Sequence, residues 1–398
     1  MAGKRSIFEE VAADPATTAG QGGAKARPAK AGGMIDARPK GARRSIRNWL
    51  VALFVLVVAM VVIGGLTRLS DAGLSITEWR PVTGAIPPLS AAAWDAEFAK
   101  YRETPQFALA FPGMTVEEFK TIFWWEWGHR QLGRIVGLVW GLGFLWFALR
   151  RAIPAGWTGR LLLVGGLGGL QGAIGWWMVA SGLEGARISV VPYRLAVHLG
   201  LAFVILGFLG WYVMLLSRPE AELMTARRGR EAKLFSLSTG LLHFSFLQIL
   251  LGALVAGTDA GQAFPTWPLM AGGLIPPDIL YVTDLDGNAL PGWHAFFEGQ
   301  AMTQFLHRMA GYLLFAFGIV VWLRGRRSAH GMTRRAFHLV MAVLAAQVVL
   351  GIVSVLTGAH PHVAITHQIG AILLWCLILR ARHLSQYPVA GSIRKGTA

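Results

Sequence analysis

Long runs of apolar residues divide the sequence into eight segments, and the connections between them carry most of the charged residues. A helix needs about 20 residues to cross a hydrocarbon core of roughly 30 Å, and each run approaches or exceeds that length. The runs recur along most of the chain, which is typical of a polytopic membrane protein. We predict eight membrane-spanning helices, at residues 49–67, 122–149, 161–181, 194–216, 235–257, 302–323, 336–357 and 363–380.

The overall composition supports an all-α integral membrane fold. Of 398 residues, 54% are hydrophobic and 15% are charged, and the mean hydropathy is +0.49. A chain this apolar cannot hide its side chains in a water-soluble core, so lipid is an expected partner. The single cysteine, Cys376, falls in the last predicted span, which excludes an intramolecular disulfide and a cysteine-based metal site.

The positive charge predicts a topology and does not indicate a nucleic-acid partner. The formal net charge is +16, and 27 of the 37 Lys and Arg residues lie at the two termini and in alternate connections between the spans. Residues 258–303, in contrast, contain no Lys or Arg. Because cytoplasmic connections are enriched in basic residues, we expect both termini of this multi-pass protein to be cytoplasmic.

Two parts of the chain share the same landmarks in the same order. The first and fifth spans each run into Asp-Ala-Gly, followed six residues later by Trp, and each next span carries His-Arg-x-x-Gly. Two spans further on, a proline precedes a histidine by six residues in both copies. The matched positions are Asp71 and Asp259, His129 and His307, and His198 and His367.

This repetition predicts two similar halves. Four spans per copy is an even number, so the copies enter the membrane the same way up, as parallel-repeat four-helix bundles. We place the N-terminal half at residues 49–217 and the C-terminal half at 235–382, joined by a cytoplasmic linker at 218–234. Residues 1–48 lack an apolar signal segment and are expected to form a disordered cytoplasmic tail, and residues 383–398 form a second tail.

The four matched histidines are expected at one depth, near the outer (periplasmic) face. Their spans all enter from that face, and each histidine comes early in its span. Pro192 and Pro361 suit the first turn of a helix. At about 1.5 Å per residue, His198 and His367 would then lie roughly 9 Å further in. His129 lies at a similar distance past the start of its apolar run.

We interpret these histidines as axial ligands of haem iron. A polar group inside a membrane is costly without a partner, so an intramembrane histidine warrants a functional hypothesis. Two imidazoles on facing helices can hold a planar macrocycle between them, here His129 with His198 and His307 with His367. A lone membrane histidine more often makes an interhelical hydrogen bond, but four at matched depth favour the iron sites.

The residues beside the ligands suggest further roles. Arg130 and Arg308 could pair with haem propionates, although arginines near an interface also extend to it without a ligand. Three residues before His129 stands Glu126, whereas Gln304 occupies the matching place in the second half. A buried carboxylate beside a haem could act as a general acid or base, so we expect chemistry in the first half. The simpler alternative is that Glu126 only pairs with a neighbouring arginine.

Residues 45–382 resemble the haem A synthase family. The resemblance lies in Glu-Trp-Gly-His129-Arg, the His198 helix, Phe-Leu-His307-Arg-Met-Ala-Gly and Thr-His367-Gln-Ile-Gly on eight helices. This family oxidises the ring D methyl group of haem O to the formyl group of haem A for cytochrome oxidase. Some relatives carry a cysteine pair in an outer loop, which this chain lacks.

The resemblance implies a set of cofactors, roles and partners. His307 and His367 would ligate a resident haem b, and His129 and His198 would hold the substrate haem O, with Glu126 as the catalytic acid or base. The product would be haem A, and the location a bacterial inner membrane. Haem O synthase, cytochrome oxidase assembly factors, an unidentified electron acceptor and a second copy of the chain are candidate partners.

Two other functions remain compatible with four membrane histidines. A b-type cytochrome would transfer electrons between a quinol and a partner, and would contain haem b alone. A haem transporter would bind its haem loosely. The identity of the bound pigment distinguishes all three functions.

Overall fold

The computed structural model describes residues 40–389, with side chains from Ala42 onward, and this part of the chain is all helical apart from loops and two isolated bridges. Most of the predicted tails, residues 1–39 and 390–398, lies outside the described residues. Eight of the described helices are long and apolar enough to cross a membrane, so the prediction of eight spans is confirmed. They are α1 (Lys40–Leu69), α4 (Val116–Leu149), α5 (Thr158–Ala180), α6 (Pro192–Leu216), α8 (Ala232–Gly257), α11 (Gln300–Gly325), α12 (Gly331–Leu356) and α13 (Pro361–Gln386).

Several helices extend past the apolar runs that predicted them. Helix α1 begins at Lys40, within the region assigned to the tail, and α4 begins at Val116 instead of residue 122. The extension of α4 has a local cause: Thr115 and Glu118 form a capping box that satisfies backbone N–H groups of the first turn. Pro192 and Pro361 are the first residues of α6 and α13, as predicted.

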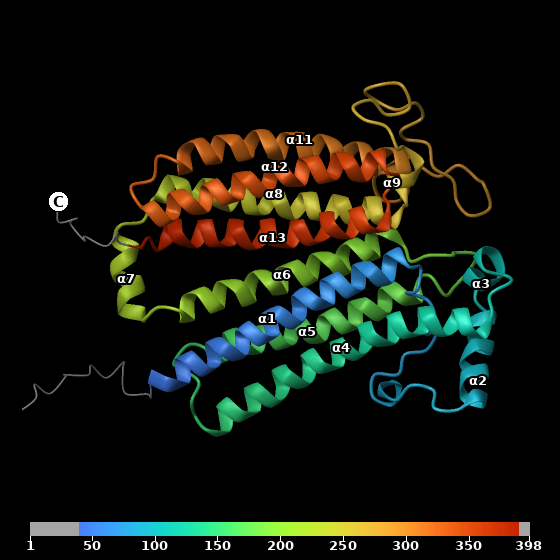
Figure 1. Cartoon of the computed structure of the whole chain (residues 1–398), viewed down its shortest axis with the longest axis horizontal. Coiled ribbons are helices and arrows are strands. Elements are labelled where there is room, and N and C mark those ends of the chain that lie inside the picture. Colours follow the sequence, from blue (N-terminus) through green and yellow to red (C-terminus); the bar gives the residue numbers. More distant parts are fainter. Residues whose placement is uncertain (1–39, 390–398) are drawn as a thin grey trace, which may run out of the picture. The chain divides into compact units, whose positions relative to one another are not determined.

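The spanning helices contact one another in two similar groups (Figure 1). In the first group α1 contacts α4 and α6, and α5 contacts α4 and α6. In the second, α8 contacts α11 and α13, and α12 contacts α11 and α13. Helix α6 also packs on α8 and α13, and α1 packs on α13. The contacts agree with two bundles side by side, while the assignment of those bundles as parallel repeats still rests on the sequence.

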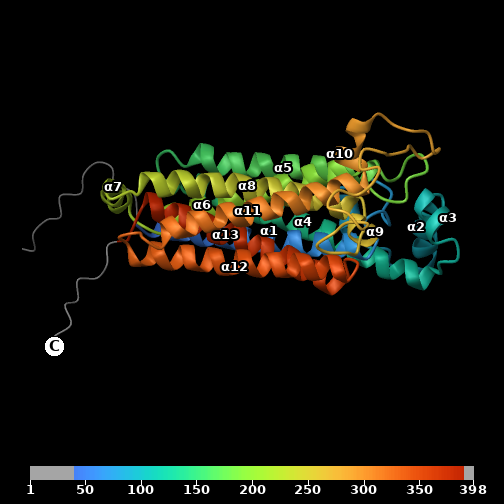
Figure 2. The same cartoon turned by 90° about the horizontal axis from the view of Figure 1, so that it is seen from above.

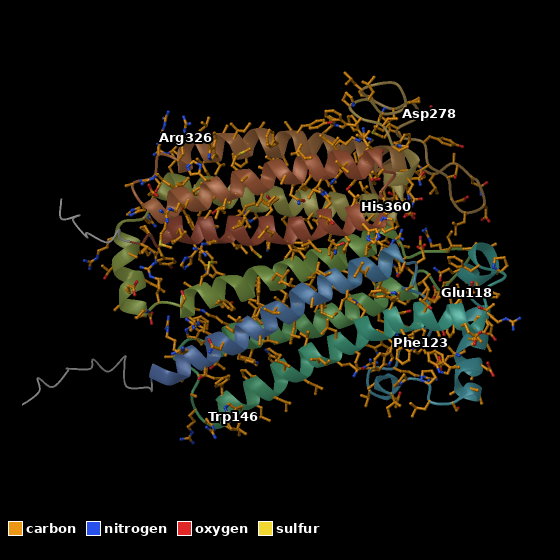
Figure 3. All side chains as sticks on the ribbon, in the orientation of Figure 1. Glu118, Phe123, Trp146, Asp278, Arg326 and His360 are labelled. Carbon is orange, nitrogen blue, oxygen red and sulfur yellow. The ribbon has the colours of Figure 1, made fainter. Side chains whose placement is uncertain are left out.

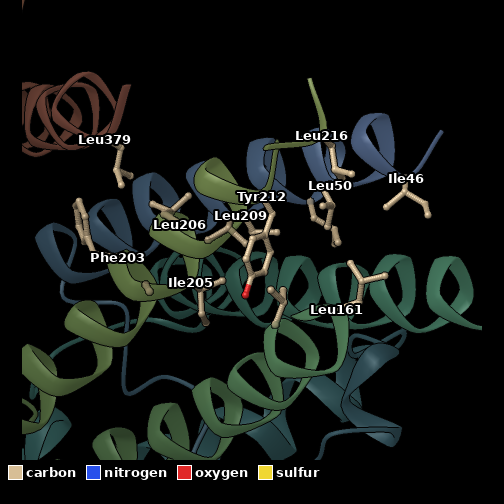
Figure 4. Packing of buried hydrophobic residues seen from close by; sticks show 14 of the residues in the cluster. Ile46, Leu50, Leu161, Phe203, Ile205, Leu206, Leu209, Tyr212, Leu216 and Leu379 are labelled. Atoms are coloured by element: carbon tan, nitrogen blue, oxygen red, sulfur yellow. The ribbon is translucent and has the colours of Figure 1, made fainter. Parts of the chain in front are cut away.

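A buried apolar cluster holds α1, α5, α6 and α13 together (Figure 4). Leu50 and Leu206 are fully buried, and Leu209 is nearly so. Phe203 of α6 meets Trp375 of α13 edge to face, with ring centroids 5.9 Å apart. Because lipid is as apolar as these side chains, close packing, more than removal from water, supplies the stabilisation here.

The connections lie at the two ends of the helices (Figures 1 and 2). At one end are α2 (Ala91–Arg102) and α3 (Pro105–Ala110), which pack on the start of α4 through Tyr101, Phe119 and Phe123. The short elements η1 (Thr83–Ala85), α9 (Ala260–Ala263), η2 (Gly292–His294) and α10 (Ala295–Glu298) belong to the connections at that same end. At the opposite end, α7 (Glu220–Arg228) forms within the stretch predicted as a linker.

The ends of the helices differ in the side chains they carry (Figure 3). Glu118, Asp278 and His360 are labelled near the end with α2 and α3, and Arg326 and Trp146 lie toward the opposite end. This distribution fits the charge pattern from which the topology was predicted. The orientation in the membrane remains a prediction.

Candidate functional site

Each of the four predicted ligands lies against a glycine of the spanning helix that precedes it. His129 lies on α4, His198 on α6, His307 on α11 and His367 on α13, and all four side chains are half-buried. A Cβ added to Gly64, Gly175 or Gly252 would come within 2.9–3.0 Å of the histidine Cε1 atom, closer than ordinary contact, whereas a Cβ at Gly351 would lie 3.4 Å away. The pairs are Gly64 with His129, Gly175 with His198, Gly252 with His307, and Gly351 with His367.

The glycine contacts repeat between the halves, which the sequence did not reveal. Gly64 and Gly252 occupy matching places seven residues before Asp71 and Asp259. In the sequence, Gly64 was visible only as a landmark of the repeat, since nothing in its spacing showed that it faces His129. The structure also brings the members of each predicted pair, His129 with His198 and His307 with His367, within range of electrostatic interaction.

One histidine of each pair is contacted by a glutamine. The side-chain nitrogen of Gln171 lies 3.2 and 3.3 Å from the two ring nitrogens of His198 and donates to the His198 backbone carbonyl at 3.0 Å. The side-chain nitrogen of Gln248 lies 3.1 and 3.4 Å from the ring nitrogens of His307 and donates to the His307 carbonyl at 2.9 Å. The role of Gln248 could not be read from the sequence, because its counterpart in the first half is Met60.

The other two histidines have a buried ring nitrogen without a partner. Within residues 42–389, the Nδ1 atoms of His129 and His367 are shielded from solvent and form no hydrogen bond. A buried polar atom left unpaired costs about 1–3 kcal/mol, so it points to a missing partner. An iron atom bound by Nδ1 would satisfy it directly, and an iron atom bound by the other ring nitrogen would reorient the ring so that Nδ1 can reach a partner.

The donor set fits haem better than a free metal ion. Over the described residues there is no group of three or more His, Cys, Asp or Glu side chains that could hold a metal. Each predicted site therefore offers two imidazoles. Two axial donors suit an iron atom whose four equatorial positions are filled by a macrocycle. The unpaired nitrogen of one histidine in each pair and this donor set fit a haem held by each pair.

Glu126 is fully engaged in hydrogen bonds. It is 3% exposed, and its Oε1 atom accepts from Nε of Arg130 at 3.0 Å and from Nη2 of the same guanidinium. Its Oε2 atom accepts from the hydroxyl of Ser75 at 2.7 Å and from the backbone N–H of Ile76 at 2.8 Å. Glu126 therefore pairs with Arg130, and it also fixes the loop that follows α1.

The arginines that follow His129 and His307 bind the same point of the two matching loops. In the first half Nη2 of Arg130 donates to the carbonyl of Ile76 at 2.7 Å. In the second half Nη2 of Arg308 donates to the carbonyl of Phe264, the counterpart of Ile76, at 3.0 Å. The Nε atom of Arg308 is buried and has no partner among the described residues. Gln304, in the place of Glu126, donates to the same Phe264 carbonyl at 3.2 Å.

The two sites approach each other across α1 and α13. Gly65, next to Gly64, faces the side chain of Gln368, which follows His367. The Gln368 side chain donates to the Val61 carbonyl of α1 at 2.7 Å. A Cβ at residue 65 would collide with the Gln368 amide, so a larger residue would have to displace that side chain from its bond to Val61.

The two Asp-Ala-Gly turns lie beside this junction. Asp71 and Asp259 both adopt a left-handed backbone conformation, with φ of 51° and 53°, which supports their interpretation as turn residues. Burial raises the pKa of Asp71, Arg68 opposes this increase, and Asp259 adds to it.

Comparison with known proteins gives full-length matches. The profile of the family described as cytochrome oxidase assembly protein matches residues 47–379. A protein named heme A synthase from Ruegeria sp. (strain TM1040) is 59% identical over 98% of this chain and 99% of its own length. Proteins of the same name from Cereibacter sphaeroides (strain ATCC 17025) and Paracoccus denitrificans (strain Pd 1222) are 59% and 56% identical, over 99% and 98% of this chain and 99% and 98% of their own lengths.

Proposed function

Since the chain belongs to the heme A synthase family, we propose that its two histidine pairs divide the reaction between a substrate haem and a resident haem. The chain is a membrane oxidoreductase that oxidises the ring D methyl group of haem O to the formyl group of haem A. The methyl carbon must lose hydrogen and gain oxygen, so the protein must remove electrons and protons at one place and supply oxygen there.

His129 and His198 hold the substrate haem O in this proposal. The difference between the halves supports the choice, because Glu126 in the first half can accept a proton and Gln304 in the second half cannot. The unpaired Nδ1 atom of His129 and the space left by Gly64 suit a ring that orients on binding iron.

His307 and His367 hold a resident haem b. When bound, that haem supplies a one-electron redox centre beside the substrate site. Gln248 orients His307 through its contacts with the ring and the backbone carbonyl, and Gly252 and Gly351 leave room for the two rings. The buried, unpaired Nε atom of Arg308 is a donor available to a propionate.

Glu126 is the proposed proton acceptor, and its hydrogen bonds determine when it is free to accept a proton. In the structure all of its acceptor positions are used by Arg130, Ser75 and Ile76. A proton can reach the carboxylate only if one of these hydrogen bonds is given up. Arg130 meanwhile keeps the loop after α1 over the first site.

The observation that carries the proposal is four half-buried histidines, each against a glycine, with a carboxylate beside only one pair. The test is to purify the protein, extract its pigments and determine their masses. We expect haem B together with haem O, a partly oxidised intermediate or haem A. His129→Ala should remove the haem O-derived pigment and keep haem B, and His307→Ala should remove haem B. Haem B as the sole pigment of the unaltered protein, from cells that make haem O, would contradict the assignment of the first site.

A further inference from the structure

The two halves differ along α4, which carries His129, and along α5, the next spanning helix. Aligning α5 with α12 on Gln171 and Gln347 places a series of glycines opposite larger residues. Aligning α4 with α11 on His129 and His307 gives the same result. Gly137 and Gly141 of α4 correspond to Phe315 and Ile319, and Gly168, Gly169 and Gly172 of α5 correspond to Leu344, Ala345 and Val348.

In the second half two of these larger side chains, Leu344 and Phe315, pack at the contact between α11 and α12. Leu344 is 4% exposed and reaches Gly318 of α11 so closely that a Cβ there would collide with it. Phe315 packs against the same buried cluster. The helices α11 and α12 are therefore joined by interlocking side chains.

In the first half the same place is open. Gly137, Gly168, Gly169 and Gly172 are exposed. A methyl group added at any of them, or at Gly141, would meet no described atom within 4 Å outside its own helix backbone. We call the space bounded by these five glycines the α4–α5 seam. An open seam at membrane depth is unusual, because helices in lipid gain their stability from close contact.

The seam has two closed ends. Toward the end with α2 and α3, the guanidinium of Arg130 lies over the ring of Trp176, 5.8 Å from its centroid. Toward the other end, the indole of Trp140 covers Gly165 and donates to the Leu161 carbonyl at 3.2 Å. At 1.5 Å per residue, the stretch of α5 from residue 165 to 176 measures about 16 Å.

The seam adjoins the first histidine pair. Gly172 lies less than one turn from Gly175, which touches His198, and Gly137 lies about 12 Å along α4 from His129. Between the closed ends, the side-chain oxygen of Gln171 is buried and has no partner within the described part of the chain. A ligand that fills this space should therefore be mainly apolar. Because the seam adjoins His129 and His198, that ligand can be a substituent of the molecule these histidines hold. A hydrogen-bond donor where the substituent joins that molecule could pair with Gln171.

We propose that the α4–α5 seam is the binding subsite for the farnesyl-derived chain of haem O. The inference rests on the proposed placement of haem O at His129 and His198. The chain of haem O is a long, apolar substituent that begins at a hydroxyl-bearing carbon next to the macrocycle, and the hydroxyl can donate to Gln171. The second half, whose seam is filled by Leu344 and its neighbours, rejects that chain and selects a haem without it.

The test fills the seam with the residues of the second half. Gly168→Leu introduces the counterpart of Leu344. Ala173→Val, at an exposed position of the same helix that is not one of the five seam glycines, introduces the counterpart of Val349 as a matched control. Both variants are purified from cells that make haem O, and the extracted haems are weighed. Gly168→Leu should lower the haem O-derived pigment by on the order of tenfold or more, equivalent to about 1.4 kcal/mol, with haem B unchanged, because the leucine side chain would occupy the space of the bound chain. Ala173→Val should keep both haems.

The outcomes separate this inference from the proposed function. Normal haem O content in Gly168→Leu, or seam density filled by a lipid acyl chain while haem O is bound, would overturn the subsite. Absence of haem O-derived pigment from the unaltered protein, purified from the same cells, would instead contradict the proposed function. If Gly168→Leu lowers both haems, Gly172→Val decides: selective loss of haem O supports the subsite, and equal retention of both haems overturns it.

Discussion

Arg68 of the first half binds Asp259 of the second half with both carboxylate oxygens, at 2.8 and 2.9 Å from its Nη2 atom. The same guanidinium donates from Nη1 to Asp71, the counterpart of Asp259, at 3.2 Å. The residue that matches Arg68 in the second half is Ala256, and its carbonyl also accepts from Arg68, at 2.9 Å. One arginine thus joins the two Asp-Ala-Gly turns.

This arrangement predicts a pH-dependent stability. Because the pKa of Asp71 is raised in the folded protein, its stabilising contribution is complete below the ordinary value of 3.8 and is lost as the pH rises through the raised folded value. Asp71→Asn stays neutral and keeps an acceptor for Arg68. We expect the melting temperature of the unaltered protein to fall relative to that of Asp71→Asn as the pH rises above roughly 4. Parallel melting curves of the two proteins at every pH would disprove the contribution of Asp71.

Glu126→Gln should separate haem binding from oxidation. The substitution preserves the shape of the side chain and removes the group that accepts a proton. We expect both haems to stay bound and the conversion of haem O to fall by about 10²–10⁴-fold, the usual contribution of an acid or base. The control is Gln304→Glu, which should leave the rate unchanged. A Glu126→Gln protein that loses haem but converts what remains at the normal rate would show a structural role only.

Gly64→Ala should displace one ligand and spare the other site. The added methyl group would lie 2.9 Å from Cε1 of His129, and forcing extra volume into a packed site costs about 1–3 kcal/mol. We expect selective loss of haem O-derived pigment with haem B retained, and the reverse for Gly252→Ala. Gly128→Ala, next to His129 but facing open space, is the control. If each of the variants Gly64→Ala and Gly252→Ala lost both haems to the same extent, the two sites would not be independent.

The oxygen atom of the formyl group is expected to come from water. If His129 and His198 both bind the iron of haem O, no iron position would be left open for oxygen gas, and removal of electrons and protons followed by addition of water would be the remaining route. Haem A formed in isotopically labelled water should carry the label in its formyl group once exchange has been corrected for. Label acquired from oxygen gas would contradict this route.

Much of the fold could be predicted because the bilayer imposes a simple pattern. Eight apolar runs gave eight helices, and Pro192 and Pro361 gave the starts of two of them. The ends were less predictable. Lys40 to Asn48 and Val116 to Thr121 continue helices beyond the apolar core, where backbone hydrogen bonds and the Thr115 cap sustain the helix and hydropathy carries no signal.

The site was predictable only as a set of residue types. The repeated motifs indicated His129, His198, His307 and His367 as candidate ligands, because residue type and spacing coincide there. The contacts of Glu126 with Ser75 and Ile76 join residues about 50 positions apart, and no local pattern encodes them. The same applies to the contact of Gly64 with His129, since a glycine in a membrane helix can serve any close approach.

The contact between Gly65 and Gln368 limits how the two halves can evolve. Copies of a duplicated unit ordinarily diverge separately, each accepting substitutions that the other never meets. Here adjacent residues of α1 serve different copies, Gly64 the ring of His129 and Gly65 the neighbour of His367. A change of register or tilt in this one helix would therefore move contacts of both His129 and His367 at once, so the two halves cannot change independently here.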